Sequence, residues 1–164
     1  YDLTIFTNTD SYMPDKGLKR YEAAKMFVNF AKHVLCREAK SVYVEWTYKD
    51  IKGIDETLLP YIKQAYEYGI MKWGNGAFRP IEKISRREFV AALMRMFMNQ
   101  YLEETNKDRY QNYEDAFNAY GLDAIVWVDD EIDRYDMSKI FYKIYYNDQY
   151  TWTNQWYVLP SDVK

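Results

Sequence analysis

The chain has 164 residues, of which 29% are charged, and a formal net charge of −3. This length allows one domain or a few small repeats with a core of their own, and the nearly balanced charge excludes a general basic surface for nucleic acid. The single cysteine, Cys36, excludes an intrachain disulfide, and no run of about 20 apolar residues occurs, so no membrane-spanning helix is expected.

The first predicted helix runs from about Leu18 to Arg37, because apolar residues recur there at three- and four-residue spacing. His33 and Cys36 lie three residues apart in it, but two ligands do not complete a metal site, so no metal is expected. The polar side of this helix is expected to face solvent and comprises Glu22, Lys25, Asn29, Lys32 and His33.

A second helix is predicted from Asp55 or Glu56 to Tyr68. It tolerates Pro60 because that residue lies near the first turn, where a backbone N–H has no partner within the helix. Gly69 follows Tyr68 at the position where a left-handed helix cap requires glycine.

The third helix is predicted from Ser85 to about Leu102. Ser85 and Glu88 fit a capping box, in which each side chain accepts a hydrogen bond from a backbone N–H of the first turn. Two further helices are predicted, from Tyr110 or Asn112 to Tyr120 and from Asp133, a good N-cap, to about Asn147.

Three of these helices begin alike, with an apolar residue, a cap position, arginine, any residue and an acid. The arginines are Arg20, Arg86 and Arg134, which lie 66 and 48 residues apart (86 − 20 and 134 − 86). Such self-similarity predicts helix-loop-helix repeats that bury their faces against one another. We therefore expect a single domain over 1–164, divided into a truncated first repeat at about 1–40, a second at 41–104, a third at 105–148 and an extended aromatic arm at 149–164.

The middle repeat, at about 48–98, carries a series of spaced motifs. They are Tyr48-Lys49-Asp50-Ile51, Ala65, Gly69-Ile70, Gly74-Asn75-Gly76-Ala77-Phe78-Arg79-Pro80 and Ile84-Ser85-Arg86-Arg87-Glu88-Phe89. Together they resemble one repeat of the S-layer homology (SLH) family, whose second helix opens with Thr-Arg-Ala-Glu after a Gly-x-x-x-Gly-x-Phe-x-Pro loop. The first repeat lacks its first helix in this comparison, and the third has a short, degenerate loop.

The resemblance implies a mostly α-helical, pseudo-threefold bundle that attaches an exported protein to a secondary cell-wall polysaccharide without a covalent bond. In the family, the motif arginine and the aspartate that opens the repeat form grooves for an acidic, often pyruvylated sugar. Carried over by position, the implied ligand residues are Arg86, Asp50, Gly74 and Gly76, with Arg20 and Arg134 supported more weakly. A guanidinium can hold a carboxylate with two parallel hydrogen bonds, which suits this role.

The sequence also departs from the family pattern. Serine replaces the motif threonine only in the middle repeat, Lys19 and Asp133 stand there in the others, and the usual tryptophan of the first helix is absent. Only one complete groove is therefore supported. The alternative is that each arginine and acid lock a helix start to its neighbour by a salt bridge.

Two functions fit this sequence. The favoured one is an extracellular structural protein of the bacterial cell surface that assembles with copies of itself as an S-layer or filament subunit. Its basis is the incomplete first repeat, which leaves an apolar face that the aromatic arm from Tyr145 to Val158 could cover, from the same chain or a neighbouring one. The alternating segments at the ends of the chain also invite pairing with another chain. The expected assembly residues are Leu3, Ile5, Tyr150, Trp152, Trp156 and Tyr157. The second function is the wall-polysaccharide anchor.

An enzyme is not expected, because the chain has no nucleophile elbow, no phosphate-binding loop and no zinc-protease motif. No cofactor is expected either. One acidic cluster leaves paired catalytic acids or a structural Ca²⁺ site open, and its residues are Asp129, Asp130, Glu131 and Asp133. It lacks the glycine and the glutamate spacing of an EF-hand. A solvated loop and helix cap is the favoured interpretation of this cluster.

Overall fold

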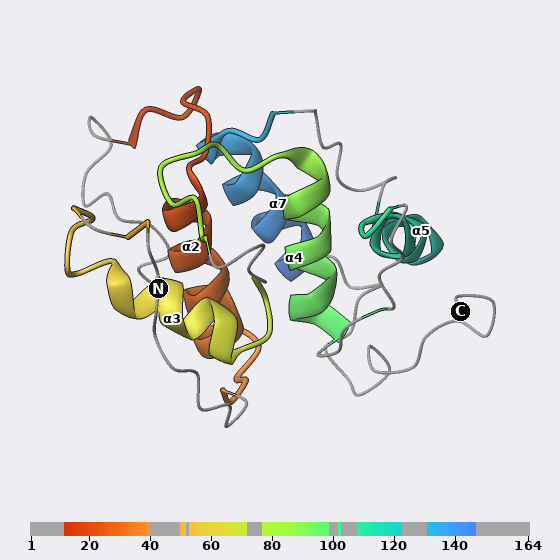
Figure 1. Ribbon diagram of the computed structural model, residues 1–164. Coiled ribbons are helices and arrows are strands. Elements are labelled where there is room, and N and C mark those ends of the chain that lie inside the picture. Colours follow the sequence, from red (N-terminus) through yellow and green to blue (C-terminus); the bar gives the residue numbers. More distant parts are fainter. Residues whose placement is uncertain are drawn as a thin grey trace.

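The computed structural model describes residues 12–39, 50–51, 53–71, 77–98, 102, 108–122 and 131–146. This part of the chain is mostly helical, which confirms the predicted fold class (Figure 1). Its helices are α2 (Arg20–His33), α3 (Leu59–Glu67), α4 (Arg86–Met98), α5 (Gln111–Ala119) and α7 (Arg134–Tyr146). The predicted terminal arms, which include Leu3, Ile5, Tyr150, Trp152, Trp156 and Tyr157, lie outside the described residues.

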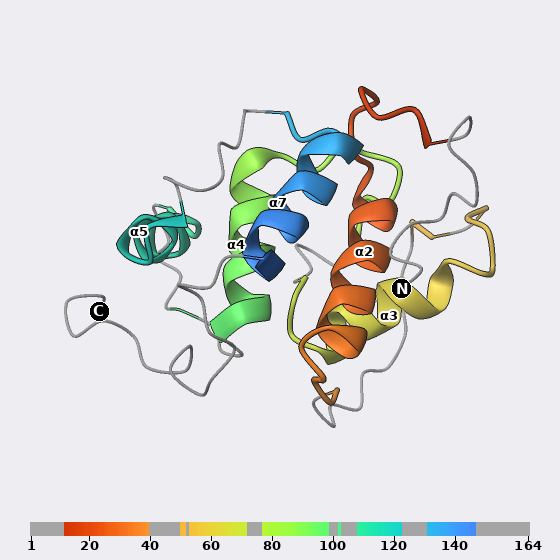
Figure 2. The same cartoon turned by 180° about the vertical axis from the view of Figure 1, so that it is seen from behind.

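The three helices that begin with the arginine motif, α2, α4 and α7, lie together at the centre (Figures 1 and 2). The other two are outer helices, since α3 packs on α2 and α5 packs on α4. None of the helices that the structure describes is long and apolar enough to cross a membrane. The division into three repeats stays a prediction, and the labels first, second and third repeat are used below for its chain ranges.

The segments that lead into the three central helices pair with one another in a ring. Isolated antiparallel bridges join Gly17 to Asp133, Lys19 to Lys83, and Ser85 to Glu131. The backbone N–H of Leu18 donates to the carbonyl of Ile132 (2.8 Å), and the N–H of Ile84 donates to the carbonyl of Leu18 (2.9 Å). Each segment therefore contacts both others, which brings the three helix starts to one end of the molecule.

Aromatic rings from α2, α4 and α7 meet in the core. The Phe27 ring lies 5.6 Å from that of Phe141, which holds the equivalent position in α7, and 5.3 Å from that of Phe89. The Phe30 ring lies 4.4 Å from that of Phe141. These rings and the neighbouring aliphatic side chains are almost fully buried, so the hydrophobic effect holds the three helices around one shared core.

The predicted caps are present. The N–H of Ser85 donates to Glu88 Oε2 (3.2 Å) and the N–H of Glu88 donates to Ser85 Oγ (3.4 Å). Asp133 and Asp136 make the same reciprocal pair at the start of α7, at 2.7 and 3.4 Å. Each pair satisfies backbone donors that have no partner within their helix.

The prediction for the polar side of α2 is wrong for two residues. Glu22 is 3% exposed and Asn29 is 6% exposed, although both were expected to face solvent. The side of α2 away from the core is not bare, because α3 packs on it and Arg134 reaches it from the third repeat. Lys32 and His33, near the end of the helix, are exposed as predicted.

Candidate functional site

Each central helix begins with an arginine that meets a neighbouring repeat, and we call these three contacts the arginine junctions. The Arg134 junction is the most buried. Its Nη2 lies 2.7 Å from Glu22 Oε1, with side chains that are 4% and 3% exposed. Its Nη1 donates to the carbonyl of Tyr12 (2.7 Å), and its backbone N–H donates to the carbonyl of Lys16 (3.3 Å). This arginine thus joins the start of α7 to the first repeat.

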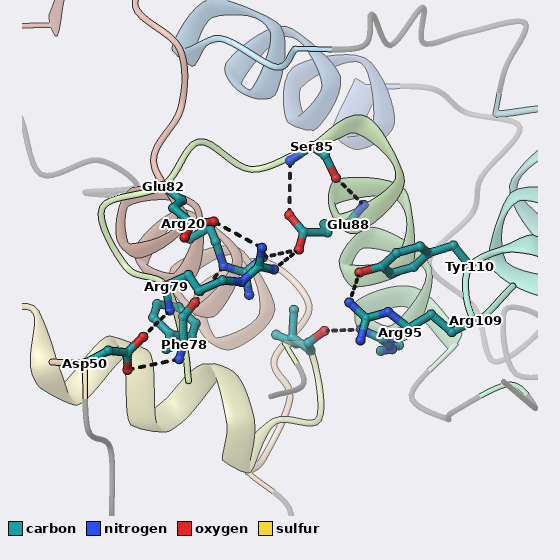
Figure 3. A network of polar contacts seen from close by, with 11 residues as sticks. Arg20, Asp50, Phe78, Arg79, Glu82, Ser85, Glu88, Arg95, Arg109 and Tyr110 are labelled. Atoms are coloured by element: carbon teal, nitrogen blue, oxygen red, sulfur yellow. Dashed lines mark hydrogen bonds and ion pairs between the residues drawn. The ribbon is translucent and has the colours of Figure 1, made fainter. Parts of the chain in front are cut away.

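The Arg20 junction repeats this arrangement between the first and second repeats (Figure 3). Its Nη1 lies 3.0 Å from Glu88 Oε1, its Nε donates to the carbonyl of Phe78 (2.7 Å), and its backbone N–H donates to the carbonyl of Glu82 (2.9 Å). Burial lowers the pKa of the Arg20 guanidinium, and the Glu88 carboxylate opposes that shift. Arg20 and Arg134 therefore each form a salt bridge to the acid of a neighbouring repeat, which is the alternative that the sequence left open.

Glu88 pairs with a second cation, the Arg79 guanidinium. Figure 3 shows Arg79 pointing toward it beside Arg20, and Arg79 Nη2 forms a close ion pair with the same Oε1. Burial alone would raise the pKa of the Glu88 carboxyl, but Arg20, the Ser85 backbone N–H and Arg79 outweigh it and hold the pKa below its ordinary value. Glu88 is therefore a charged acid shared by two guanidinium groups and one helix cap.

Asp50 holds the loop that carries Arg79. Its carboxylate accepts hydrogen bonds from the backbone N–H groups of Phe78 (3.1 Å) and Arg79 (2.6 Å). Arg79 has a φ of 56°, a left-handed conformation that is costly for residues other than glycine, and these two bonds help to stabilise it. Asp50 thus stabilises the backbone conformation of the loop that carries Arg79. The predicted loop glycines, Gly74 and Gly76, lie outside the described residues.

The Arg86 junction differs from the other two. Arg86 Nη1 lies 2.8 Å from Glu114 Oε1, on α5, and the two side chains are 32% and 17% exposed. The neighbouring Arg87 donates from Nε to the other oxygen of Glu114 (3.0 Å) and from Nη2 to Asp108 Oδ2 (2.6 Å). Two half-exposed guanidinium groups from the start of α4 thus converge on one carboxylate.

Tyr110 extends this cluster at the start of α5. The Arg87 guanidinium lies 5.6 Å and that of Arg109 4.7 Å from the centre of its ring, and Arg109 also donates to its hydroxyl (Figure 3). Hydrogen bonds to Asp108 and Glu114 raise the pKa of Arg87. The result is a partly exposed group of cations around an aromatic ring and two acids.

Arg87, Tyr110 and Glu114 were not among the site residues predicted from the sequence. A second feature that was not predicted is that Tyr12-Met13-Pro14 has the same local structure as Phe78-Arg79-Pro80. In both loops the middle residue has a positive φ, 44° and 56°, and the proline carbonyl accepts a hydrogen bond from the residue after the junction arginine. The sequence does carry a signal for this similarity, because an aromatic-x-proline sequence begins eight residues before Arg20 and eight residues before Arg86.

The residues considered for metal binding have other places in the structure. Glu131 pairs with Lys83 (2.6 Å) and Asp133 caps α7, while Asp129 and Asp130 lie outside the described residues. His33 and Cys36 are exposed at the end of α2. In the part of the chain that the structure describes, no three residues of the types His, Cys, Asp and Glu gather as a metal-binding group.

Comparison with known proteins supports the resemblance in the middle repeat. Residues 47–90 match the family model of the S-layer homology domain. The match contains Asp50, the loop around Pro80 and the capped start of α4. No curated protein matches the chain. The S-layer homology domain is a non-catalytic module that binds cell-wall polysaccharide. The chain therefore resembles S-layer homology domain proteins through its second repeat, and it is an extracellular protein of the bacterial cell surface.

Proposed function

We propose that this chain attaches to an acidic polysaccharide of the bacterial cell wall without a covalent bond, and that Arg86 and Arg87 hold carboxylate groups of that polymer. The observation that carries the proposal is that these two guanidinium groups, which lie in the segment matched by the SLH family, converge on one carboxylate, that of Glu114.

Burial favours Arg86 over its two equivalents as the ligand residue. The side chains of Arg20 and Arg134 are 5% and 4% exposed, and both are held in ion pairs within the fold. Arg86 and Arg87 are 32% and 39% exposed, so a ligand can reach them from solvent. Ligand roles for Arg20, Arg134, Asp50, Gly74 and Gly76 stay predictions.

The chemistry of the cluster fits an acidic sugar. Glu114 occupies the place that a ligand carboxylate would take, because both of its oxygens accept hydrogen bonds from the two arginines. Charge-assisted bonds from guanidinium groups are the strongest that a protein offers to such an anion. Tyr110 adds an amphipathic ring beside Arg87, suited to contact with the apolar face of a sugar. Binding then exchanges one carboxylate for another.

The test is cosedimentation of the chain with purified cell-wall polysaccharide. Arg86→Ala and Arg87→Ala are expected to lower the affinity by about tenfold or more each, since one charge-assisted bond contributes about 1.5 to 3 kcal/mol. The matched control is Lys32→Ala, which removes one exposed positive charge at the far end of α2. The same polymer with its carboxyl groups reduced to alcohols should not bind. Failure of the unmutated chain to bind the acidic polymer would refute the proposal.

Assembly with copies of itself, as an S-layer or filament subunit, is the second candidate. The terminal segments on which it was predicted lie outside the described residues. The observation that favours it within the described residues is a row of exposed tyrosines on α7.

A further inference from the structure

The loop that carries Arg79 supplies a cation that the equivalent loop of the first repeat lacks. In the first repeat the equivalent residue is Met13, which has a φ of 44° against 56° for Arg79. Glu22 forms its ion pair there with Arg134, and no other cation pairs with it in the part of the chain that the structure describes. These two side chains are nonetheless only 3% and 4% exposed. One arginine is therefore enough to close such a junction, and Arg79 is additional.

The position of the Arg79 side chain comes at a conformational cost. Its φ lies in the left-handed region, where glycine or asparagine is tolerated better than arginine. Asp50 supports this backbone with two hydrogen bonds, and the side chain that the loop presents stays 41% exposed. Backbone strain that the surrounding structure holds in place is concentrated at ligand sites. A strained, exposed arginine that the junction does not require therefore points to a ligand.

Tyr110 connects Arg79 with the proposed polysaccharide site. The guanidinium of Arg87 lies 5.6 Å from the centre of the Tyr110 ring. Figure 3 shows the hydroxyl of the same tyrosine pointing toward the Arg79 guanidinium. Burial alone would lower the pKa of Arg79, but two acids and the Tyr110 hydroxyl outweigh burial and raise the pKa. Arg79 and Arg87 thus both border one aromatic ring, Arg79 at its hydroxyl end.

We propose that Arg79 and Tyr110 form a second subsite beside Arg86 and Arg87, and that the polysaccharide carries acidic groups on neighbouring sugars. One acidic group binds to Arg86 and Arg87, a sugar ring packs on Tyr110, and the next acidic group binds to Arg79. This inference rests on the proposed function and adds to it the requirement for two acidic groups about one sugar apart. Two linked groups bind more strongly than one, because the second binds from a high effective concentration.

Arg79 can exchange partners without opening the fold. Its second acid, Glu82, is 55% exposed and lies 3.1 Å from Nη1 of Arg79. An ion pair that is this exposed contributes little to stability, so a ligand replaces Glu82 at low cost. Glu88 keeps its ion pair with Arg20, whose side chain is 5% exposed, when Arg79 turns to a ligand. The buried part of the Arg20 junction therefore stays closed during binding.

Cosedimentation with purified cell-wall polysaccharide tests the role of Arg79. Arg79→Asn removes the charge, suits the left-handed backbone and is expected to lower the affinity by about tenfold, since one charge-assisted contact is lost. The matched control, Met13→Asn, makes the same change in the equivalent loop and should leave the affinity unchanged. Glu82→Gln should raise the affinity, because the resident acid no longer competes, whereas a purely structural Arg79 predicts no gain. Thermal melting checks that all three variants fold.

Partial reduction of the polymer tests the requirement for two acidic groups. When about half of its carboxyl groups are converted at random to alcohols, about a quarter of the neighbouring pairs remain intact. At low occupancy, the unmutated chain should therefore keep about a quarter of its binding to the half-reduced polymer. Arg79→Asn should keep about half of its own binding, because one acidic group is enough for the site that remains.

The outcomes separate this inference from the proposed function. Binding that Arg79→Asn leaves unchanged, or that Glu82→Gln does not strengthen, overturns the second subsite. So does an unmutated chain that keeps about half of its binding to the half-reduced polymer, because it then needs a single acidic group. Each of these results leaves polysaccharide binding by Arg86 and Arg87 in place. An unmutated chain that does not bind the unmodified polymer refutes the proposed function and this inference with it.

Discussion

Arg134 and Arg86 occupy the same place in two repeats, but their surroundings differ. Arg134 and its partner Glu22 are almost fully buried, whereas Arg86 and its partner Glu114 are about a third and a sixth exposed. Arg134 pairs with the acid at the start of the next central helix around the ring. At the start of α7 the corresponding acid is Asp136, which is one methylene shorter than Glu22 and accepts a hydrogen bond from the backbone N–H of Asp133.

The comparison shows that a motif arginine is buried in an ion pair in one repeat and partly exposed in another, as the ligand role that we propose for Arg86 requires. A buried arginine that loses its carboxylate leaves an uncompensated charge in a medium of low dielectric constant, so its pairing is obligatory. A half-exposed arginine exchanges one anion for another at little cost, because water screens both states. Burial, rather than the motif itself, therefore distinguishes the structural role of Arg134 from the ligand role that we propose for Arg86.

The largest effect is expected from breaking the most buried junction. Arg134→Met leaves Glu22 buried without its cation and should lower the free energy of unfolding by about 3 to 5 kcal/mol. Urea denaturation measures the loss, with Lys32→Met as the exposed control. Adding Glu22→Gln to Arg134→Met should restore part of the stability, because the unpaired charge is then gone. A loss below about 1 kcal/mol would mean that this ion pair is not structural.

A smaller loss is expected at the Arg20 junction. Arg20→Met should cost about 1.5 to 3 kcal/mol, because Glu88 is more exposed than Glu22 and keeps Arg79 as a second cation. The double variant with Arg79→Met should lose more than the sum of the two single losses, since each arginine compensates for the other. Equal losses for Arg20→Met and Arg134→Met would contradict this ranking.

Acid should weaken the Arg20 junction further. The pKa of Glu88 is lowered in the folded chain, because Arg20, the Ser85 N–H and Arg79 outweigh the opposing effect of burial. The stability from this group is therefore present above the ordinary value of 4.5 and is lost as the pH falls through the lower, folded pKa. Unfolding measured between about pH 5 and pH 3 should depend less on pH in Glu88→Gln than in the unmutated chain. An unchanged pH dependence in Glu88→Gln would show that the Glu88 carboxyl does not contribute to the loss of stability in acid.

The smallest effect on stability is expected at the Arg86 junction, where the effect on binding is largest. Arg86→Met should change the free energy of unfolding by less than about 1 kcal/mol, as exposed ion pairs do. Glu114→Gln sharpens the contrast, because removing the resident charge should strengthen binding of the acidic polymer without unfolding the chain. Weaker binding by Glu114→Gln would show that Glu114 positions the arginines instead of competing with the ligand.

Local patterns in the sequence predicted the helices well. The caps at Ser85 and Asp133 and the periodic apolar residues depend only on neighbouring positions, so α4 and α7 begin within one residue of where they were expected. Pro60 likewise lies at the start of α3. The S-layer homology resemblance was found in the one repeat whose loop and cap motifs are both intact.

The contacts between repeats could not be predicted in the same way. The burial of Glu22 depends on Arg134, which lies 112 residues away, and helical periodicity carries no information about such a partner. The role of Glu114 depends on how α5 packs on α4. The equivalence of Met13 and Arg79 was accessible from the sequence, because an aromatic residue and a proline flank both.

Leu18 exchanges hydrogen bonds with segments from both other repeats, and Arg134 contacts Tyr12 across 122 residues of sequence. In a linear solenoid each repeat contacts only its neighbours, so folding can spread from any point. Here the first and last repeats must meet before the ring of helix starts closes, which raises the contact order and slows folding. A chain growing from its N-terminus cannot complete its first repeat until Arg134 has been synthesised. We expect that a chain truncated before α7 would not fold, and that the full chain would unfold in a single cooperative transition.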